Sequence, residues 1–202
     1  MPEEIRRDHH MVSGGKVLLV FGSAYGQTEK IVRRLAIRLE ENGNRCVVAR
    51  GNALPPGLRL EEFDGFVVAG SVLFGRHQKY LEEFVRDHHI GLGSRPSMFL
   101  SVCGAMSDRT REGEAQAEKY RRAFLKRTGW APRFAYSLAG AIAYTRYGLL
   151  TRWMMRLISR HNGGPVDTSR DWEFTDWDAV DRHGQELART LAGDFPTVLA
   201  LR

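Results

Sequence analysis

Short, continuous runs of apolar residues recur along the chain. The clearest lie at 17–21, 66–69 and 97–103, and apolar and polar residues do not alternate in any of them. Strands with this pattern are covered on both faces, as in parallel sheets. Residues 45–49 and 133–143 are strand-like as well, so the chain is predicted to form five strands.

Helical periodicity separates most of these strands. Ile31, Leu35 and Leu39 lie four residues apart with charged residues between them, which predicts a helix over 27–42 that ends near Gly43. The same pattern predicts three further helices, over 78–89, 114–127 and 175–191.

The order of these elements predicts an α/β domain in which helices cover both faces of a parallel sheet. Residues 51–62, which contain Pro55 and Pro56, are interpreted as a loop that replaces one helix. The last helix is predicted to begin at Thr175, which forms a loose capping box with Asp178. We assign residues 15–195 to one domain, 1–14 to a disordered leader and 196–202 to a C-terminal tail.

Residues 144–170 form an insertion between the last strand and the last helix. One face of a predicted helix in it carries Leu149, Leu150, Trp153, Met154, Leu157 and Ile158, and another carries Arg152, Arg156 and Arg160. Such a helix lies on an anionic membrane or covers an apolar ligand, or else it packs into the core with solvated arginines. Candidates for contact with a substrate or a membrane are therefore Arg146, Tyr147, Arg152, Trp153 and Arg156.

Composition narrows the classes of partner. The chain has 202 residues and a formal net charge of +6, which favours anionic partners such as membrane lipids or acidic small molecules. The basic residues are dispersed and lack an interleaved aromatic platform, so no role with nucleic acid is predicted. No apolar run approaches the roughly 20 residues that span a bilayer, and the N-terminus lacks the apolar core of a signal peptide. Cys46 and Cys103 form no metal or redox motif, so we expect reduced thiols in a cytoplasmic protein and no metal site.

The loop after the first strand carries the strongest chemical signal. In the segment KVLLVFGSAYGQT, residues 16–28, an apolar strand ends in small and hydroxyl residues just before a helix begins. Backbone N–H groups and the helix dipole at such a junction bind phosphate well. The loop has neither the lysine of a Walker A motif nor the glycine spacing of a dinucleotide site. A bound monophosphate therefore fits it best, and an ordinary turn without a ligand is the alternative.

Two further loops follow strands whose ends are expected to lie at the same edge of the sheet. They span 70–77 and 101–108, and both are rich in glycine and small residues. Ligands of open parallel sheets bind beyond the carboxyl ends of the strands. Phe74 can cover the face of an aromatic ring. One phosphate loop and two loops around a flat ring describe a site for flavin mononucleotide (FMN).

These elements and loops resemble flavodoxin. The segments GSAYGQT, AGSVLFGRH, AGAIAYTRY and HNGGPVDTSRDWEFTDW, together with the position of the insertion, resemble more closely the flavodoxin-type, quinone-dependent protoporphyrinogen oxidases of bacteria. The resemblance covers nearly the whole domain. It implies a three-layer sandwich whose five-stranded parallel sheet has the order 2-1-3-4-5, with a long insertion after the fifth strand.

The resemblance also implies which residues bind FMN. The phosphate would be held by Ser23, Ala24, Tyr25, Gly26, Gln27 and Thr28. The isoalloxazine ring would be flanked by Ser71, Val72, Leu73, Phe74 and Gly75 and by Ser101, Val102, Cys103, Gly104 and Ala105. Flavodoxins usually have threonine where Tyr25 stands, so we expect one hydroxyl contact to be lost while the backbone N–H still donates.

By the same resemblance, the protein is expected to oxidise protoporphyrinogen IX to protoporphyrin IX in haem biosynthesis. Electrons would pass through FMN to menaquinone or ubiquinone, and the protein would be cytoplasmic or peripheral on the inner face of the cell membrane. Its basic charge would stabilise a reduced, anionic flavin, which suits an oxidase better than an electron shuttle. No side chain is assigned as a catalytic acid or base. A flavodoxin-like electron carrier and an FMN-dependent NAD(P)H:quinone reductase are the alternatives.

Overall fold

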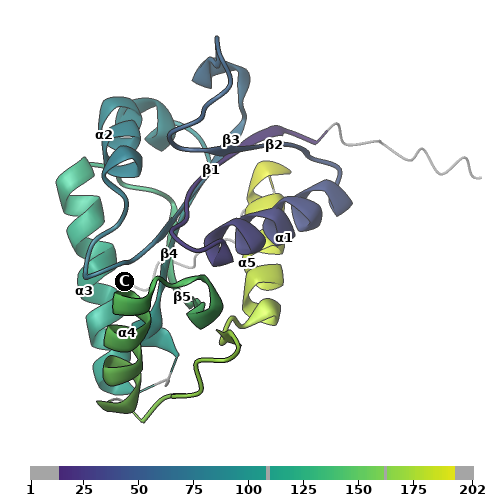
Figure 1. The fold of residues 1–202 in the computed structure, drawn as a ribbon. Coiled ribbons are helices and arrows are strands. Elements are labelled where there is room, and N and C mark those ends of the chain that lie inside the picture. The colour runs from purple at the N-terminus through teal and green to yellow at the C-terminus, as the bar shows by residue number, and fades with distance from the viewer. Residues whose placement is uncertain (1–13, 108–109, 162, 194–202) are drawn as a thin grey trace, which may run out of the picture.

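A computed structural model describes residues 14–107, 110–161 and 163–193. Its centre is a parallel sheet in the order β2-β1-β3-β4-β5 (Figure 1). The strands are β1 (Lys16–Gly22), β2 (Arg45–Arg50), β3 (Gly65–Ser71), β4 (Ser97–Cys103) and β5 (Phe134–Ala139). The predicted fold class and the sheet order 2-1-3-4-5 are therefore confirmed.

Helices cover both faces of this sheet, which makes a three-layer sandwich (Figure 1). One face carries α1 (Gln27–Glu41) and α5 (Trp177–Leu191), and the other carries α2 (Lys79–Gly93) and α3 (Arg111–Thr128). Because both faces are covered, no side chain from Val17 to Phe21 is more than 4% exposed. This double burial explains why the central strands are apolar runs rather than alternating patterns.

The parallel register brings the carboxyl ends of three strands to one edge of the sheet. β1 pairs with β3 as far as Gly22 and Gly70, and β3 pairs with β4 as far as Ser71 and Val102. The loops that follow β1, β3 and β4 are therefore neighbours. This edge is where open α/β sheets bind their ligands.

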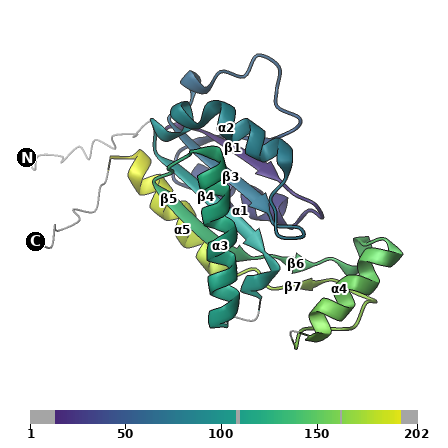
Figure 2. The ribbon, with the colours of Figure 1, turned by 90° about the vertical axis from the view of Figure 1, so that its left-hand side faces the viewer.

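The predicted strand 133–143 is in fact two strands that belong to two sheets. β5 ends at Ala139, and after Gly140 the chain leaves the main sheet. The next strand, β6 (Ala141–Ile142), pairs antiparallel with β7 (Trp172–Glu173). The apolar pattern continues through Gly140, so it does not reveal the change of partner. β6 and β7 form the base of the insertion and carry it away from the main sheet (Figure 2).

The start of α5 also differs from the prediction. Its N-cap is Asp176, whose carboxylate accepts a hydrogen bond from Ala179 N at 2.9 Å. Thr175 instead donates its hydroxyl to Ala139 O at 3.0 Å and accepts from the Gln27 side chain at 2.8 Å. Thr175 therefore fastens the end of the insertion to β5 and to the start of α1.

The insertion contains the helix α4 (Leu149–His161), whose apolar face is exposed. Leu149, Leu150 and Trp153 are 84%, 78% and 62% exposed, and Ser159 is the buried residue of this helix. The interpretation of α4 as a helix packed into the core is therefore wrong. Among the described residues, no helix is both long and apolar enough to cross a bilayer.

The remaining predictions concern the loops and the ends of the chain. Residues 51–62 form no α-helix, as predicted, and contain the 3₁₀ turn Leu60–Glu62 and an isolated bridge from Ala53 to Arg50. Of the expected leader, 1–14, only Gly14 is described, and the expected tail, 196–202, lies outside the described residues. Cys46 is half-buried in β2, and burial raises the pKa of its thiol to about 12. Cys46 is therefore a neutral packing residue.

Candidate functional site

Residues 23–28, called the phosphate loop here, comprise the connection from β1 to α1 and the first two residues of α1. Ser23 Oγ accepts a hydrogen bond from Gly26 N at 2.9 Å, and Ser71 Oγ accepts one from Ala24 N at 3.1 Å. Gly26 has a φ angle of 95°, a left-handed conformation that glycine adopts without strain. Ser23 therefore shapes the loop, and its contact with a phosphate stays a prediction.

The start of α1 has the features of an anion site. Gly26 is its N-cap, and within the described part of the chain no side chain caps the first turn, whose N–H groups have no partners within a helix. Thr28 is fully buried, yet its Oγ1 has no hydrogen-bond partner among the described residues. A buried hydroxyl without a partner costs free energy. An anion held at this helix end would supply the missing acceptor.

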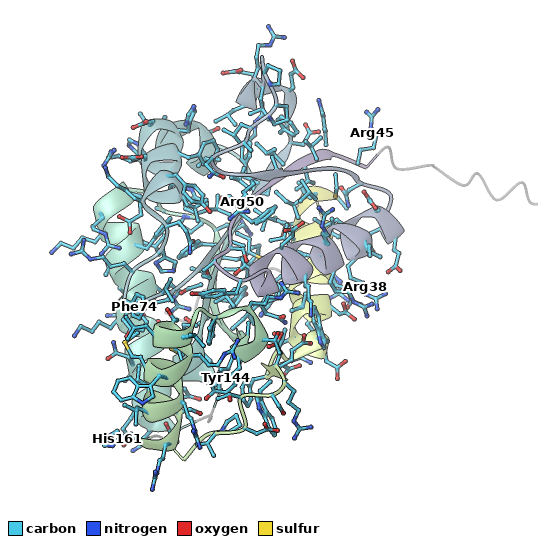
Figure 3. All side chains as sticks on the ribbon, in the orientation of Figure 1. Arg38, Arg45, Arg50, Phe74, Tyr144 and His161 are labelled. Carbon is cyan, nitrogen blue, oxygen red and sulfur yellow. The ribbon has the colours of Figure 1, made fainter. Side chains whose placement is uncertain are left out.

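The loop after β3 is a tight turn with an exposed aromatic residue at its tip. Phe74 and Gly75 have φ angles of 49° and 79°, and Leu73 and Arg76 exchange backbone hydrogen bonds of 2.9 and 3.2 Å. Positive φ at both central positions is typical of a type I′ turn, and it is strained for phenylalanine. Phe74 is 65% exposed and lies on the side of the molecule that carries α4 (Figure 3).

Two side chains that follow this turn brace the ends of β3 and β4. His77 is buried, with its Nε2 at 3.0 Å from Ser101 Oγ, and Gln78 donates its side-chain N–H to Ser71 Oγ at 2.7 Å. Burial, and secondarily the positive charge of Arg127, lowers the pKa of His77 to about 3. No role for His77 is predicted from the sequence, because nothing in the local pattern shows that its side chain turns back beneath the loop.

The neutral His77 is expected to give the fold a specific sensitivity to acid. An unfolded histidine takes up a proton near pH 6.5, whereas folded His77 stays neutral down to about pH 3. Between these values the unfolded state binds more protons, so the free energy of unfolding falls by up to about 1.4 kcal/mol for each pH unit of acidification. Urea unfolding should show a shallower pH slope for His77→Gln than for the wild type, and equal slopes would contradict this assignment.

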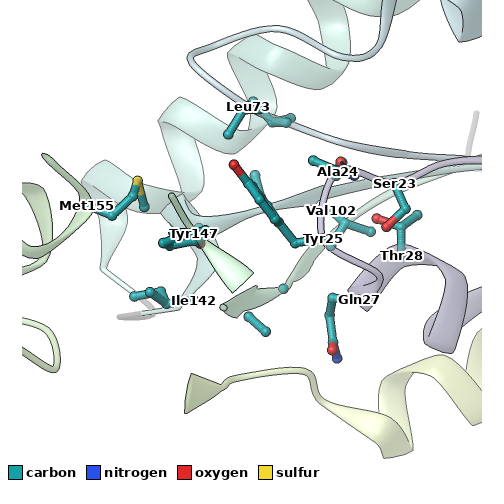
Figure 4. Close-up of a pocket in the computed structure, with 16 residues that line it drawn as sticks. Ser23, Ala24, Tyr25, Gln27, Thr28, Leu73, Val102, Ile142, Tyr147 and Met155 are labelled. Atoms are coloured by element: carbon teal, nitrogen blue, oxygen red, sulfur yellow. Dashed lines mark hydrogen bonds between the residues drawn. The ribbon is translucent and has the colours of Figure 1, made fainter. Parts of the chain in front are cut away.

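The insertion contacts the phosphate loop directly. Arg146 donates from Nη1 to Tyr25 O at 2.8 Å. The rings of Tyr25 and Tyr147 meet edge to face, with centroids 4.5 Å apart (Figure 4). Tyr147 is buried, and its hydroxyl accepts from Ala143 N at 3.1 Å. Tyr25 thus packs against the insertion.

The other candidates in the insertion lie in different surroundings. Arg152 donates from Nε to Tyr144 O at 2.9 Å and from Nη2 to Tyr147 O at 3.2 Å, so its guanidinium links α4 to the preceding turn. Trp153 and Arg156 are exposed on α4. Contacts of these residues with a substrate or a membrane stay predictions.

Two adjoining cavities lie at this edge of the sheet. The smaller, of about 100 Å³, is lined by the phosphate loop and by Tyr147 (Figure 4). The larger, of about 710 Å³, lies between the turn at Phe74, α3 and α4. They share the lining residues Val72, Leu73, Cys103, Gly104, Ile142 and Met155. Of the residues predicted to bind the cofactor, only Gly26 and Ser101 line neither cavity.

The residues present fit a flavin whose phosphate lies at the start of α1. The uncapped helix and the Thr28 hydroxyl suit an anion, and the shared lining residues lead from the small cavity into the large one. Burial raises the pKa of Cys103 to about 11, so this thiol is neutral beside the ring site. No cluster of metal-ligating side chains is found among the residues that the structure describes.

Comparisons with known proteins agree with this geometry. A family model described as a flavodoxin domain matches residues 18–169. The chain is 33% identical over 183 residues to protoporphyrinogen IX dehydrogenase (quinone) of Escherichia coli strain K12, covering 91% of this chain and 99% of that protein. A Leishmania major protein of the same name is 28% identical over 177 residues, covering 86% of this chain and 74% of its own length. Oxidised flavodoxin 1 from Bacillus cereus has the same fold, with a TM-score of 0.51 at 16% identity, covering 86% of this chain and 97% of its own.

Proposed function

The chain belongs to the flavodoxin-domain family that includes protoporphyrinogen IX dehydrogenase (quinone), and from this premise we propose that it oxidises protoporphyrinogen IX with bound FMN and a membrane quinone as acceptor. The observation that carries the proposal is the pair of adjoining cavities. One ends at the start of α1 and at a buried hydroxyl that has no partner among the described residues, and the other has room for a large, mainly apolar molecule. The expected product is protoporphyrin IX, so the reaction belongs to haem biosynthesis.

The phosphate loop would hold the cofactor phosphate. The free N–H groups at the start of α1 and the Thr28 hydroxyl would donate to it. The phosphate loop contains no lysine or arginine. The guanidinium of Arg146, which donates a hydrogen bond to Tyr25 O, would place a positive charge beside the phosphate. The small cavity suits one phosphate group, which favours FMN over a dinucleotide.

The isoalloxazine ring would lie against the loops that follow β3 and β4. Residues 71–75 and 101–105 form this slot, and the brace between His77 and Ser101 fixes the end of β4 beneath it. When bound, the flavin accepts two electrons in each round of oxidation. The protein would orient the isoalloxazine ring and the substrate macrocycle relative to each other and would exclude water from between them.

The exposed apolar face of α4 favours contact with a membrane, which is where a lipid-soluble quinone is found. Leu149, Leu150 and Trp153 project from this face, and Arg156 and Arg160 are exposed on the same helix. Apolar side chains flanked by arginine are typical of helices that lie on anionic bilayers. The acceptor would be menaquinone or ubiquinone, and the protein would lie on the inner face of the cell membrane.

Anaerobic reduction by defined donors tests this function. The protein loaded with FMN is expected to lose its yellow absorbance with protoporphyrinogen IX and to keep its colour with NADH or NADPH. Porphyrin fluorescence is expected once a quinone is added as acceptor, because three two-electron rounds are needed to form the porphyrin. The same chain without flavin serves as the control for spontaneous oxidation. Bleaching by a nicotinamide alone would indicate a quinone reductase, and bleaching by neither donor would indicate an electron carrier.

A further inference from the structure

The larger cavity has a wall that the flavin site does not explain. Gly113, Gln116 and Tyr120 of α3 lie three and four residues apart and face the cavity from one side. Met155 and Ile158 of α4 face it from the other. Figure 2 shows α4 carried out from the sheet on β6 and β7, at a distance from α3.

The chemistry of this cavity points to a second ligand. Its volume of about 710 Å³ falls in the range of roughly 300–1,000 Å³ that is typical of sites for small organic molecules. Ser107 Oγ lines it, is buried, and has no hydrogen-bond partner among the described residues. Glu112 is the one carboxylate among the lining residues, and the others are mainly apolar or aromatic.

We propose that the tetrapyrrole binds between α3 and α4 in this cavity, with Glu112 as the acceptor of a pyrrole proton. The proposal rests on the proposed function, which supplies the substrate and the oxidant. The ring system of a porphyrinogen is broad and apolar, with four N–H donors and no acceptor at its centre, and the two propionates of protoporphyrinogen IX lie on its edge. The aromatic and aliphatic walls suit its faces, and the carboxylate suits its N–H groups.

Each two-electron round breaks two bonds of the macrocycle. A bound flavin would serve as the oxidant and would take up a hydrogen with both electrons of a methylene-bridge C–H bond, and Glu112 would take up the proton of the N–H bond of an adjoining pyrrole. A new double bond conjugates the bridge with that pyrrole ring. Because Glu112 is exposed at the first turn of α3, it can return the proton to solvent before the next round.

Filling the cavity tests the location of the site. Gln116→Trp and, from the opposite wall, Ile158→Trp are expected to raise the Kd for protoporphyrin IX by about tenfold or more. The probe is the stable porphyrin, titrated by fluorescence into protein loaded with FMN. Lys119→Trp, on the exposed side of α3, is the matched control and should leave the Kd unchanged.

The outcomes separate the two proposals. If the wild type binds porphyrin and both tryptophan variants bind it equally well with normal FMN content, the assigned site is wrong and the proposed function stands. If the wild type loaded with FMN neither binds porphyrin nor oxidises protoporphyrinogen, both the proposed function and the assigned site are wrong.

The role of Glu112 has its own test, because a carboxylate in the first turn of α3 also stabilises the helix. Glu112→Gln is expected to lower kcat by about 100-fold or more and to remove the acidic limb of the pH–rate profile. Glu112→Asp should restore part of the rate and of that limb. A variant with a lower Tm but the wild-type rate and pH profile would overturn the assignment.

Discussion

Replacing Leu149, Leu150 and Trp153 together by serine is expected to release the protein from anionic vesicles. All three side chains are exposed on α4. Burying such a side chain in an apolar phase contributes about 1.5–3 kcal/mol. If the three side chains are only partly immersed, they contribute about 3 kcal/mol together to membrane binding. Replacing them should then weaken binding about 100-fold, which vesicle sedimentation measures directly. Reduction of quinone embedded in the same vesicles should fall with the bound fraction.

The chain offers a matched control for this experiment. Ile90 on α2 is 78% exposed, as is Leu150, but it lies outside the insertion. Ile90→Ser should therefore leave vesicle binding intact. Binding of the wild type should also weaken as salt is added, because Arg156 and Arg160 attract anionic head groups through water. Equal binding by the triple variant and the wild type would mean that α4 does not face the membrane.

The strands and helices can be predicted from local patterns of apolar residues, because the pattern within each strand depends on which of its two faces is buried. Val17 to Phe21 is buried on both faces, so its uniform apolarity indicates a central parallel strand without knowledge of its neighbours. The phosphate loop is similarly local, since the strand, the small residues and the helix that form it are consecutive. The local pattern therefore predicts a phosphate site at this loop, whereas the individual cofactor residues are implied by the resemblance to flavodoxins.

The parts that the sequence did not predict depend on contacts between distant segments. Ala141 and Ile142 continue an apolar pattern but pair with β7, about thirty residues along the chain. Thr175 resembles a cap and instead binds Ala139 and Gln27, because Asp176 takes the capping position. The larger cavity is likewise invisible in the sequence, since it exists only where α3 and α4 face each other.

Amphipathic periodicity predicted α4 correctly but could not decide what its apolar face meets. A helix packed into the core and a helix on a membrane have the same spacing of apolar residues. The difference lies in whether the rest of the fold leaves a surface for that face to cover. Here α1, α2, α3 and α5 already cover both faces of the sheet, so α4 is left with its apolar face exposed.

Thr28→Val is expected to change the stability of the cofactor-free protein and its affinity for FMN in opposite directions. Valine keeps the shape and the β-branching of threonine and removes a buried hydroxyl that has no partner among the described residues. Removing such a group should stabilise the protein without flavin by about 1 kcal/mol. The same change removes a hydrogen bond to a charged phosphate, worth about 1.5–3 kcal/mol, so the Kd for FMN should rise about 10- to 100-fold. Urea unfolding and quenching of flavin fluorescence measure the two effects.

Control ligands and control variants test whether the opposite effects on stability and on FMN affinity depend on the phosphate. Riboflavin lacks the phosphate, so its Kd should be the same for the wild type and for Thr28→Val, whereas Thr28→Ser should keep most of the affinity for FMN. Thr190 is equally buried on α5, but its hydroxyl donates to Glu186 O at 2.9 Å. Thr190→Val should therefore bring no gain in stability, because the hydroxyl it removes already has a partner. If Thr28→Val weakened FMN and riboflavin by the same factor, the hydroxyl would be shaping the loop and not binding the anion.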